Sequence, residues 1–103
     1  MDWKVAWTSS AWDDLEATAD YIAKDSQHYA AGFVFEVKEA ASSLTHFAER
    51  GHIVPEFNDP KIRELFVGNY RLIYQVAGKN VYVIGFVHGA RDLWRLWEQT
   101  RKA

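Results

Sequence analysis

The chain has 103 residues, the size of one domain with a modest hydrophobic core, and shows no linker or internal repeat. It contains no cysteine, which excludes disulfides, thiolate nucleophiles and cysteine zinc sites. The formal net charge is −2, whereas domains that mainly bind a nucleic-acid backbone carry an excess of Lys and Arg. We therefore expect a single domain, residues 1–103, that does not bind DNA or RNA directly through its charge.

Neither a metal site nor a membrane segment is indicated. The four histidines lack the close spacing of metal ligands, and no catalytic metal motif surrounds them; they are His28, His46, His52 and His88. No apolar run is long enough to span a bilayer, and the first ten residues lack the pattern of a signal peptide. We expect a soluble, cytoplasmic protein without a cofactor, a metal or a membrane partner.

The first half of the chain predicts one strand and two helices. Residues 3–8 alternate apolar and polar side chains, as a half-buried strand does. Residues 10–25 and 27–50 repeat apolar side chains at helical spacing, with Ser9 and Ser10 as the first cap and Gly51 as the final stop. Acidic residues fall in the expected first turn, at the positive end of the helix dipole: Asp13, Asp14 and Glu16. The two helices should form a hairpin with their apolar sides facing the same way.

The second half predicts an antiparallel sheet. A loop with both prolines spans residues 52–61, and β-branched and aromatic runs follow at residues 62–67, 70–76 and 81–88. Gly68-Asn69 and the segment AGKN between these runs are hairpin signals. The fold class is therefore α+β: an N-terminal strand, a helical hairpin, a three-stranded antiparallel meander and a short C-terminal helix or tail.

Alternation along the strands predicts which side chains share a face. One face suits the helices and would carry Leu65, Val67, Leu72, Tyr74, Val83 and Val87. The other would carry Glu64, Phe66, Arg71, Ile73, Tyr82, Ile84, Phe86 and His88. Because one helical hairpin covers only one face, we expect the second face to present a groove or to meet a partner.

The string VHGARDLW, residues 87–94, follows the last predicted strand and is rich in functional side chains. Trp94 and Trp97 are three residues apart, so on a short helix capped by Asp92 they would point the same way. Trp is enriched at interface hot spots, so these rings are candidate anchors for a partner. The alternative is that the tail folds back onto the sheet and completes a small core.

In this order, the strings AWDDLEATADYIAKDS, VPEFNDPKIREL, NYRLIYQV and VHGARDL resemble the RelE/ParE superfamily of bacterial toxins from type II toxin–antitoxin systems. The resemblance covers nearly the whole chain and is closer to the ParE branch. It implies a small curved antiparallel sheet with a helical hairpin on one side. It also implies growth inhibition, a link to plasmid stabilisation, and neutralisation by a cognate antitoxin whose amino-terminal part binds DNA.

The superfamily contains two kinds of toxin. Some members cleave mRNA on the ribosome, and the ParE branch inhibits DNA gyrase by protein contact. Arg71 and Arg91 match functional arginines of the nucleases, but Ile62 and Glu64 stand where two lysines are expected, and Trp97 stands near an expected tyrosine. A nuclease of the lysine type is therefore not expected.

A different nuclease pattern of the superfamily uses a glutamate, an arginine and a histidine, which Glu64, Arg71 and His88 could supply as base, phosphate clamp and acid. The simpler explanation for Glu64 and Arg71 is a cross-strand ion pair. Likewise, His88 with Arg91 and Asp92 could simply hold the turn after the last strand.

We therefore predict a toxin that inhibits DNA gyrase by contact, with an antitoxin and gyrase as partners and with DNA reached only through the antitoxin. The expected target-binding residues are Arg71, His88, Arg91 and Asp92, and the expected antitoxin-binding residues are Phe66, Phe86, Trp94 and Trp97. The alternative is a ribosome-dependent mRNA endoribonuclease that uses Glu64, Arg71 and His88. A third reading is a superfamily member whose toxic activity has been lost.

Overall fold

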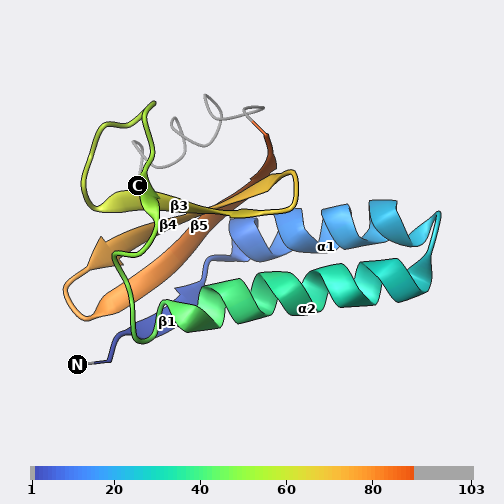
Figure 1. Ribbon diagram of the computed structural model, residues 1–103, viewed down its shortest axis with the longest axis horizontal. Helices are drawn as coiled ribbons and strands as arrows, with labels where there is room; N and C mark the ends of the chain where they lie inside the picture. The colour runs from blue at the N-terminus through green and yellow to red at the C-terminus, as the bar shows by residue number, and fades with distance from the viewer. Residues whose placement is uncertain (1, 90–103) are drawn as a thin grey trace.

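A helical hairpin packs along one face of a curved five-stranded sheet in the computed structural model, which describes residues 2–89 (Figure 1). The elements are β1 (Lys4–Trp7), α1 (Ser9–Ala23), α2 (Gln27–Ser43), β2 (His52–Ile53), β3 (Ile62–Val67), β4 (Tyr70–Ala77) and β5 (Asn80–His88). The predicted α+β fold is confirmed for these elements, whereas the predicted C-terminal helix or tail lies outside the described residues. Neither described helix is both long and apolar enough to cross a bilayer.

The strand order in the sheet is β1-β5-β4-β3-β2. The first and last strands of the chain are neighbours, because β1 pairs in parallel with β5, from Lys4 opposite Asn80 to Trp7 opposite Val83. The predicted meander is confirmed by the antiparallel pairs β3–β4 and β4–β5. Its two turns begin at Gly68 and Gly78, whose φ angles of 59° and 62° favour glycine. The predicted loop also contains the short strand β2, which pairs with β3.

Both helices begin at a side-chain cap. The hydroxyl of Thr8 accepts a hydrogen bond from the amide of Ala11 at 3.1 Å, so α1 begins earlier than predicted, and Asp13 and Asp14 lie beyond its first turn. The hydroxyl of Ser26 accepts from the amide of Tyr29 at the same distance. These bonds satisfy amides that have no acceptor within the helix.

The second helix ends at Ser43 and not at Gly51, so its predicted length was wrong. The amide of Leu44 bonds to the carbonyl of Ala41, which tightens the last turn, and the carbonyl of Thr45 accepts from the amide of Trp3 at 2.8 Å. Leu44 and Ala48 are fully buried in the turns that follow. Their apolar spacing extends the helical pattern, but they fill the core from a turn.

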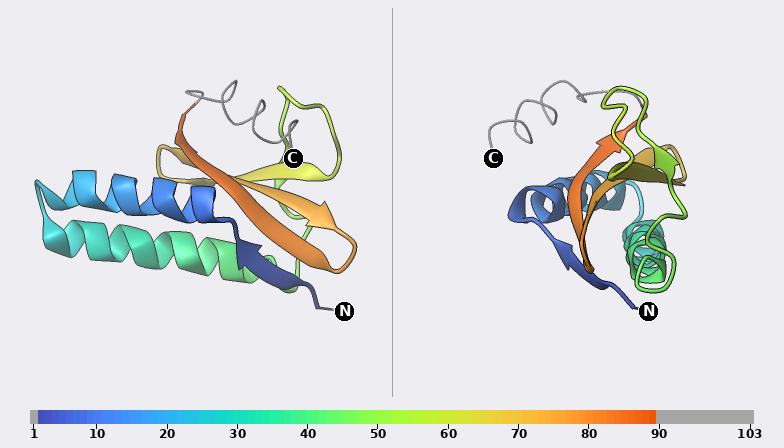
Figure 2. Two further views of the ribbon diagram at one scale, coloured as in Figure 1. Left: turned by 180° about the vertical axis from the view of Figure 1, so that it is seen from behind. Right: turned by 90° about the vertical axis from the view of Figure 1, so that its left-hand side faces the viewer.

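The main core lies between the helices and the sheet (Figure 2). Leu15 of α1 and Val37 of α2 meet the inner sheet face, where Leu72, Tyr74 and Val83 are fully buried. Closing this interface removes the apolar side of each helix from water, which is the main stabilising contribution to such a fold.

A second, smaller core lies on the outer face of the sheet. Val54, Ile62 and Ile73 are buried there, and Phe57, Ile84 and Val87 pack against them. The segment between β2 and β3, drawn in green in Figure 1, supplies Val54 and Phe57 from the side of the sheet away from the helices. The prediction that this face is uncovered is therefore wrong for its central part, although Phe66 remains 60% exposed.

A bulge in β5 changes which face its last residues occupy. Ile73 pairs with Gly85 and Tyr74 pairs with Val83, so Ile84 is an extra residue between them. Beyond it, His88 pairs with Tyr70 and Phe86 pairs with Leu72. Phe86 and His88 therefore lie on the helix side and Val87 on the outer side, opposite to the prediction. Gly85 was the available signal, because an isolated glycine within a strand often marks a bulge.

Gly51 stands where the chain returns from α2 to the sheet, and its backbone touches two strands. Its amide donates a hydrogen bond to the hydroxyl of Tyr74 at 2.9 Å, and Tyr74 is fully buried. A Cβ atom at Gly51 would lie 2.6 Å from both this hydroxyl and the carbonyl oxygen of Glu64. Only glycine fits this close approach.

We expect Gly51→Ala to lower the free energy of unfolding by about 2–3 kcal/mol, because the added methyl group forces a buried ring and a strand backbone apart. The control is Gly32→Ala in α2, where a Cβ atom would meet nothing within 4 Å. This control should raise the free energy of unfolding by about 0.5–1 kcal/mol. Urea unfolding measures both, and equal effects of the two substitutions would contradict the close approach.

Candidate functional site

Arg71 is a buried cation on the outer face of the sheet. Its residue exposure is 5%, and that of Glu64, on the neighbouring strand β3, is 4%. The Nε atom of Arg71 donates a hydrogen bond to Oε1 of Glu64 at 2.5 Å. The cross-strand ion pair considered from the sequence is therefore present, and it is buried.

The remaining sides of the Arg71 guanidinium are also occupied. Nη1 and Nη2 donate to the two carboxylate oxygens of Glu56, at 3.2 Å and 3.1 Å. Nη1 also donates to the carbonyl oxygen of Gly89 at 3.3 Å. Arg71 thus joins strand β3, the segment between β2 and β3, and the end of the sheet beyond β5. We call Arg71, Glu56 and Glu64 the Arg71 cluster.

Hydrogen bonds within the Arg71 cluster favour the charged forms of Arg71 and Glu56. Burial works against the charged form of Arg71, but hydrogen bonds to Glu56 and Glu64 outweigh it and raise the pKa of Arg71. The hydrogen bond from Arg71 lowers the pKa of Glu56. One cation between two carboxylates leaves a net charge of −1, which would repel a phosphate. The N–H groups of Arg71 therefore already bond to Glu56, Glu64 and Gly89, and a phosphate would have to displace one of these acceptors.

His88 lies on the opposite side of the sheet from the Arg71 cluster. It pairs with Tyr70, and its ring makes an edge contact with the Tyr70 ring at a centroid distance of 5.0 Å. The predicted set of Glu64, Arg71 and His88 is thus divided: the structure brings Glu64 and Arg71 together and places His88 on the helix side. The prediction that all three share one face is wrong because of the bulge at Ile84.

The other predicted site residues fall into three groups. Phe66 is on the surface next to Arg71 and is 60% exposed. Phe86 is 3% exposed and packs against Phe33 and Tyr70, so its predicted place on an exposed face is wrong. Four residues lie outside the described part of the chain, and their predicted roles are untested: Arg91, Asp92, Trp94 and Trp97.

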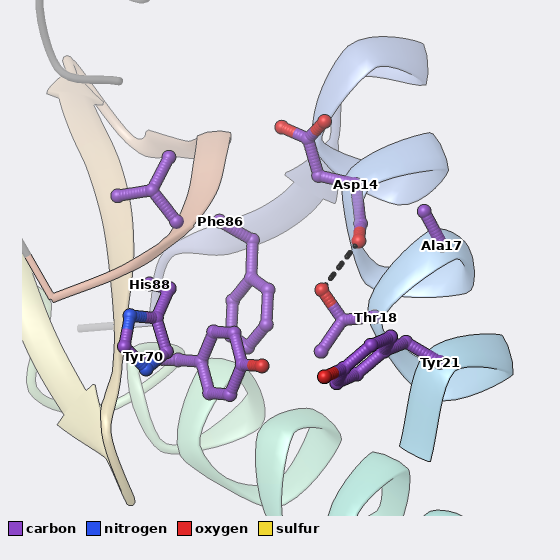
Figure 3. Close-up of a pocket in the computed structure, with 8 residues that line it drawn as sticks. Asp14, Ala17, Thr18, Tyr21, Tyr70, Phe86 and His88 are labelled. Atoms are coloured by element: carbon purple, nitrogen blue, oxygen red, sulfur yellow. Dashed lines mark hydrogen bonds between the residues drawn. The ribbon is translucent and has the colours of Figure 1, made fainter. Parts of the chain in front are cut away.

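The structure shows a groove that the sequence did not predict. Two hollows share Tyr70 in their lining, one between α1 and the ends of β4 and β5 and the other between the helical hairpin and the turn before β4. We call them together the Tyr70 groove. The first, of about 290 Å³, is lined by Ala17, Thr18 and Tyr21 of α1 and by Tyr70, Phe86 and His88 of the sheet. Figure 3 shows Tyr21 and Tyr70 pointing toward one another across it.

The second hollow of the Tyr70 groove measures about 340 Å³ and lies beside the turn between β3 and β4. Tyr29, Phe33 and Glu36 of α2 line it together with Tyr70. The Tyr70 ring is held by stacking on Phe86 at a centroid distance of 5.2 Å. The available signal was Tyr21 and Tyr29, two aromatic side chains outside the apolar stripes of their helices, each 69% exposed.

We expect Arg71→Met to lower the free energy of unfolding by about 3–5 kcal/mol at neutral pH, because Glu64 is left as a buried carboxylate without its cation. The double variant Arg71→Met with Glu64→Leu removes both buried charges and should return to within about 1 kcal/mol of the wild type. Urea unfolding of the single and double variants measures the difference. A double variant as unstable as the single one would contradict this account of the Arg71 cluster.

The pairing of Glu56 with Arg71 predicts part of the acid sensitivity. Because the pKa of Glu56 is lowered from its ordinary value of 4.5, this pairing stabilises the protein above that value and is lost as the pH falls through the lowered one. Glu56→Gln should therefore show a smaller fall of melting temperature between about pH 6 and about pH 3 than the wild type. The matched control is Glu16→Gln on the exposed side of α1, which should keep the wild-type slope.

Comparisons with known proteins agree on one superfamily of toxins. A family model described as the ParE toxin of type II toxin–antitoxin systems, parDE, matches residues 5–93. A protein of Caulobacter vibrioides named Toxin RelE2 is 36% identical over 89 residues, which make up 85% of this chain and 97% of that protein.

Two solved structures share the fold. A chain of the chromosomal ParDE system from P. aeruginosa matches with a TM-score of 0.70 and 23% identity, over 84% of this chain and 96% of that one. A chain of the toxin–antitoxin complex RelBE2 from Mycobacterium tuberculosis matches with a TM-score of 0.58 and 22% identity, over 85% and 99%. The family match and the 36% identical relative show that this chain belongs to the RelE/ParE superfamily, in the ParE toxin family of type II toxin–antitoxin systems.

Proposed function

We propose that this toxin inhibits growth by binding a protein target, DNA gyrase, and that a cognate antitoxin neutralises it. The observation that carries the proposal is the burial and the hydrogen bonding of the Arg71 side chain. Its guanidinium is buried and bonded to Glu56, Glu64 and the carbonyl of Gly89. A nuclease that used Arg71 to clamp a phosphate would have to break these bonds first.

Two further observations support contact over RNA cleavage. A base and an acid for cleavage must approach one phosphodiester together, yet Glu64 and His88 lie on opposite sides of the sheet. The net charge of −2 gives little attraction for an RNA backbone. Inhibition by contact needs neither a catalytic set nor a basic surface.

The antitoxin is proposed from the family and from the neighbouring structures, whose titles describe a ParDE system and a RelBE2 toxin–antitoxin complex. The names RelE2 and RelBE2 also keep the mRNA endoribonuclease as the alternative, with Glu64, Arg71 and His88 as its residues. Arg71 was also expected to contact the target, but in the proposed function its buried side chain instead supports the sheet and the turn at Gly89. His88, Arg91 and Asp92 remain the proposed contacts to the target.

The two candidate functions predict different effects of the toxin on bacterial cells. Expression of the toxin in bacteria should block replication, cause filamentation and induce the DNA-damage response, and the purified toxin should inhibit gyrase supercoiling of a relaxed plasmid. Translation extracts should show no new cleavage of ribosome-bound mRNA. Codon-level cuts with unchanged gyrase activity would overturn the proposal in favour of the endoribonuclease.

Glu64→Gln separates the two functions with one substitution. It removes the only general base that the nuclease alternative assigns, which should reduce mRNA cleavage by about 10²–10⁴-fold if that alternative holds. Under the proposed function, toxicity should stay within about threefold of the wild type, because the amide still accepts a hydrogen bond from Arg71. Urea unfolding of the same variant must be measured beside toxicity, so that lost folding is not counted as lost function.

A further inference from the structure

We propose that the free side of α2 is the contact surface for a second copy of this chain, in a two-fold symmetric dimer of antiparallel α2 helices. Val37 and Ala41 face the core, and Figure 1 shows α2 along one border of the molecule. The residues on the opposite side of the helix are all exposed: His28, Ala31, Gly32, Phe35, Glu39 and Ser42. We call these six residues the α2 outer face.

Phe35 is the one large apolar side chain of the α2 outer face. It is 64% exposed, in the middle of a 17-residue helix. The neighbours one turn earlier, Ala31 and Gly32, are small, and a Cβ atom at Gly32 would meet nothing within 4 Å. The face therefore combines a protruding ring with a flat stretch of helix. A second copy of the same face can complement this shape, because the ring of each copy can cover the flat stretch of the other.

Two-fold symmetry fixes which residues of two antiparallel helices face each other. If the symmetry axis passes midway between residues 33 and 34, Phe35 lies over Gly32 of the second copy. The same axis places His28 opposite Glu39 of the second copy. A histidine ring can donate a hydrogen bond to a carboxylate in either of its protonation states. One register thus gives both an apolar contact and a polar contact, and symmetry makes each of them twice.

Charge favours α2 over α1 for this contact. The sequence of α1 has four acidic residues and no basic residue, so two copies that met through α1 would repel each other. The sequence of α2 has Glu36, Lys38 and Glu39, hence a net charge of −1. On the α2 outer face, Glu39 is the acidic residue and His28 is its complement. This face has no Lys or Arg for a nucleic-acid backbone.

The size of the α2 outer face sets the affinity to expect. A helix of 17 residues is about 25 Å long. One side of such a helix offers less than the area of about 800 Å² that each partner buries in a standard interface. We therefore expect a weak and reversible dimer, with a dissociation constant on the order of 100 µM.

Sedimentation equilibrium of the purified toxin, at concentrations up to about 1 mM, measures this dimer. Phe35→Ala should raise the dissociation constant by at least about tenfold, because a symmetric dimer loses the ring twice. Gly32→Leu should do the same by filling the space for that ring. It should not lower the free energy of unfolding, because leucine is a better helix former than glycine. The control Phe47→Ala, at a 67% exposed ring beyond the end of α2, should change the dissociation constant by less than about twofold.

An exchange of charges tests the register of the two helices. His28→Glu should weaken the dimer by about threefold to tenfold, because it places carboxylates opposite each other at two symmetric positions. The double variant His28→Glu with Glu39→Lys should return to within about twofold of the wild type. Positions 28 and 39 are separated by about 16 Å along one helix, so they cannot pair within a chain. Restored association therefore requires the second copy.

Several outcomes would overturn the proposal. One is a toxin that stays monomeric at about 1 mM. Another is a dimer that Phe47→Ala weakens as much as Phe35→Ala does, or a double variant that associates no better than His28→Glu. If the toxin is monomeric and Phe35→Ala instead weakens its complex with the antitoxin, the α2 outer face belongs to that partner. The assays of gyrase and of mRNA cleavage are separate, so the proposed function can fail or stand independently of the dimer.

Discussion

A buried guanidinium needs hydrogen-bond acceptors for its N–H groups. In this structure, three segments on the outer side of the sheet supply those acceptors to Arg71. Arg71 bonds to Glu64 on β3, to Glu56 in the segment before β3, and to the carbonyl of Gly89 beyond β5. The segment that carries Glu56 also covers Ile73 with Val54, so the ionic contacts and the small outer core form together. Removing Arg71 would leave the buried Glu64 without its cation, so the buried ion pair depends on both of its partners.

The end of the last strand is fixed from both sides. The amide of Gly89 donates to the carbonyl of Asn69 at 2.8 Å, and its own carbonyl accepts from Arg71. Its φ of 53° turns the chain at this point. Arg71 matches a functional arginine of the nucleases by its position in the sequence, but here it helps to fix the turn of the chain at Gly89. Such a role is compatible with a toxin that works by contact, because contact requires a defined surface and no proton transfer.

The two faces of the sheet make different contacts. The inner face meets the helices, closes the main core and, at its open end, forms the Tyr70 groove. The outer face holds the Arg71 cluster and Phe66. The bulge at Ile84 sets this division, since it moves His88 to the groove and Val87 to the outer core. The groove brings the helical hairpin, residues 9–43, against the ends of β4 and β5, which lie far from it in sequence.

The sequence by itself determined the two helices, the four longer strands, the hairpin turns and the family, but not β2 or the end of α2. Alternation in residues 3–8, the helical spacing of Leu15 and Val37, and the glycines at the turns are local signals, and local geometry obeys them. Register between β3 and β4 was also predictable, because a two-residue turn fixes it. The ion pair of Glu64 with Arg71 followed from that register.

Only the tertiary structure decided the rest. The extra residue at Ile84 reverses the alternation of β5, and Gly85 is its one local sign, since the apolar side chains of VYVIGFVH suit both faces there. The third partner of Arg71, Glu56, comes from a loop whose path is set by the burial of Val54 and not by any local repeat. The Tyr70 groove likewise exists only where the helices and the strand ends meet, so its lining comes from segments that the tertiary fold brings together. The periodicity of a segment shows which of its sides is apolar, whereas tertiary packing decides which other segments that side contacts.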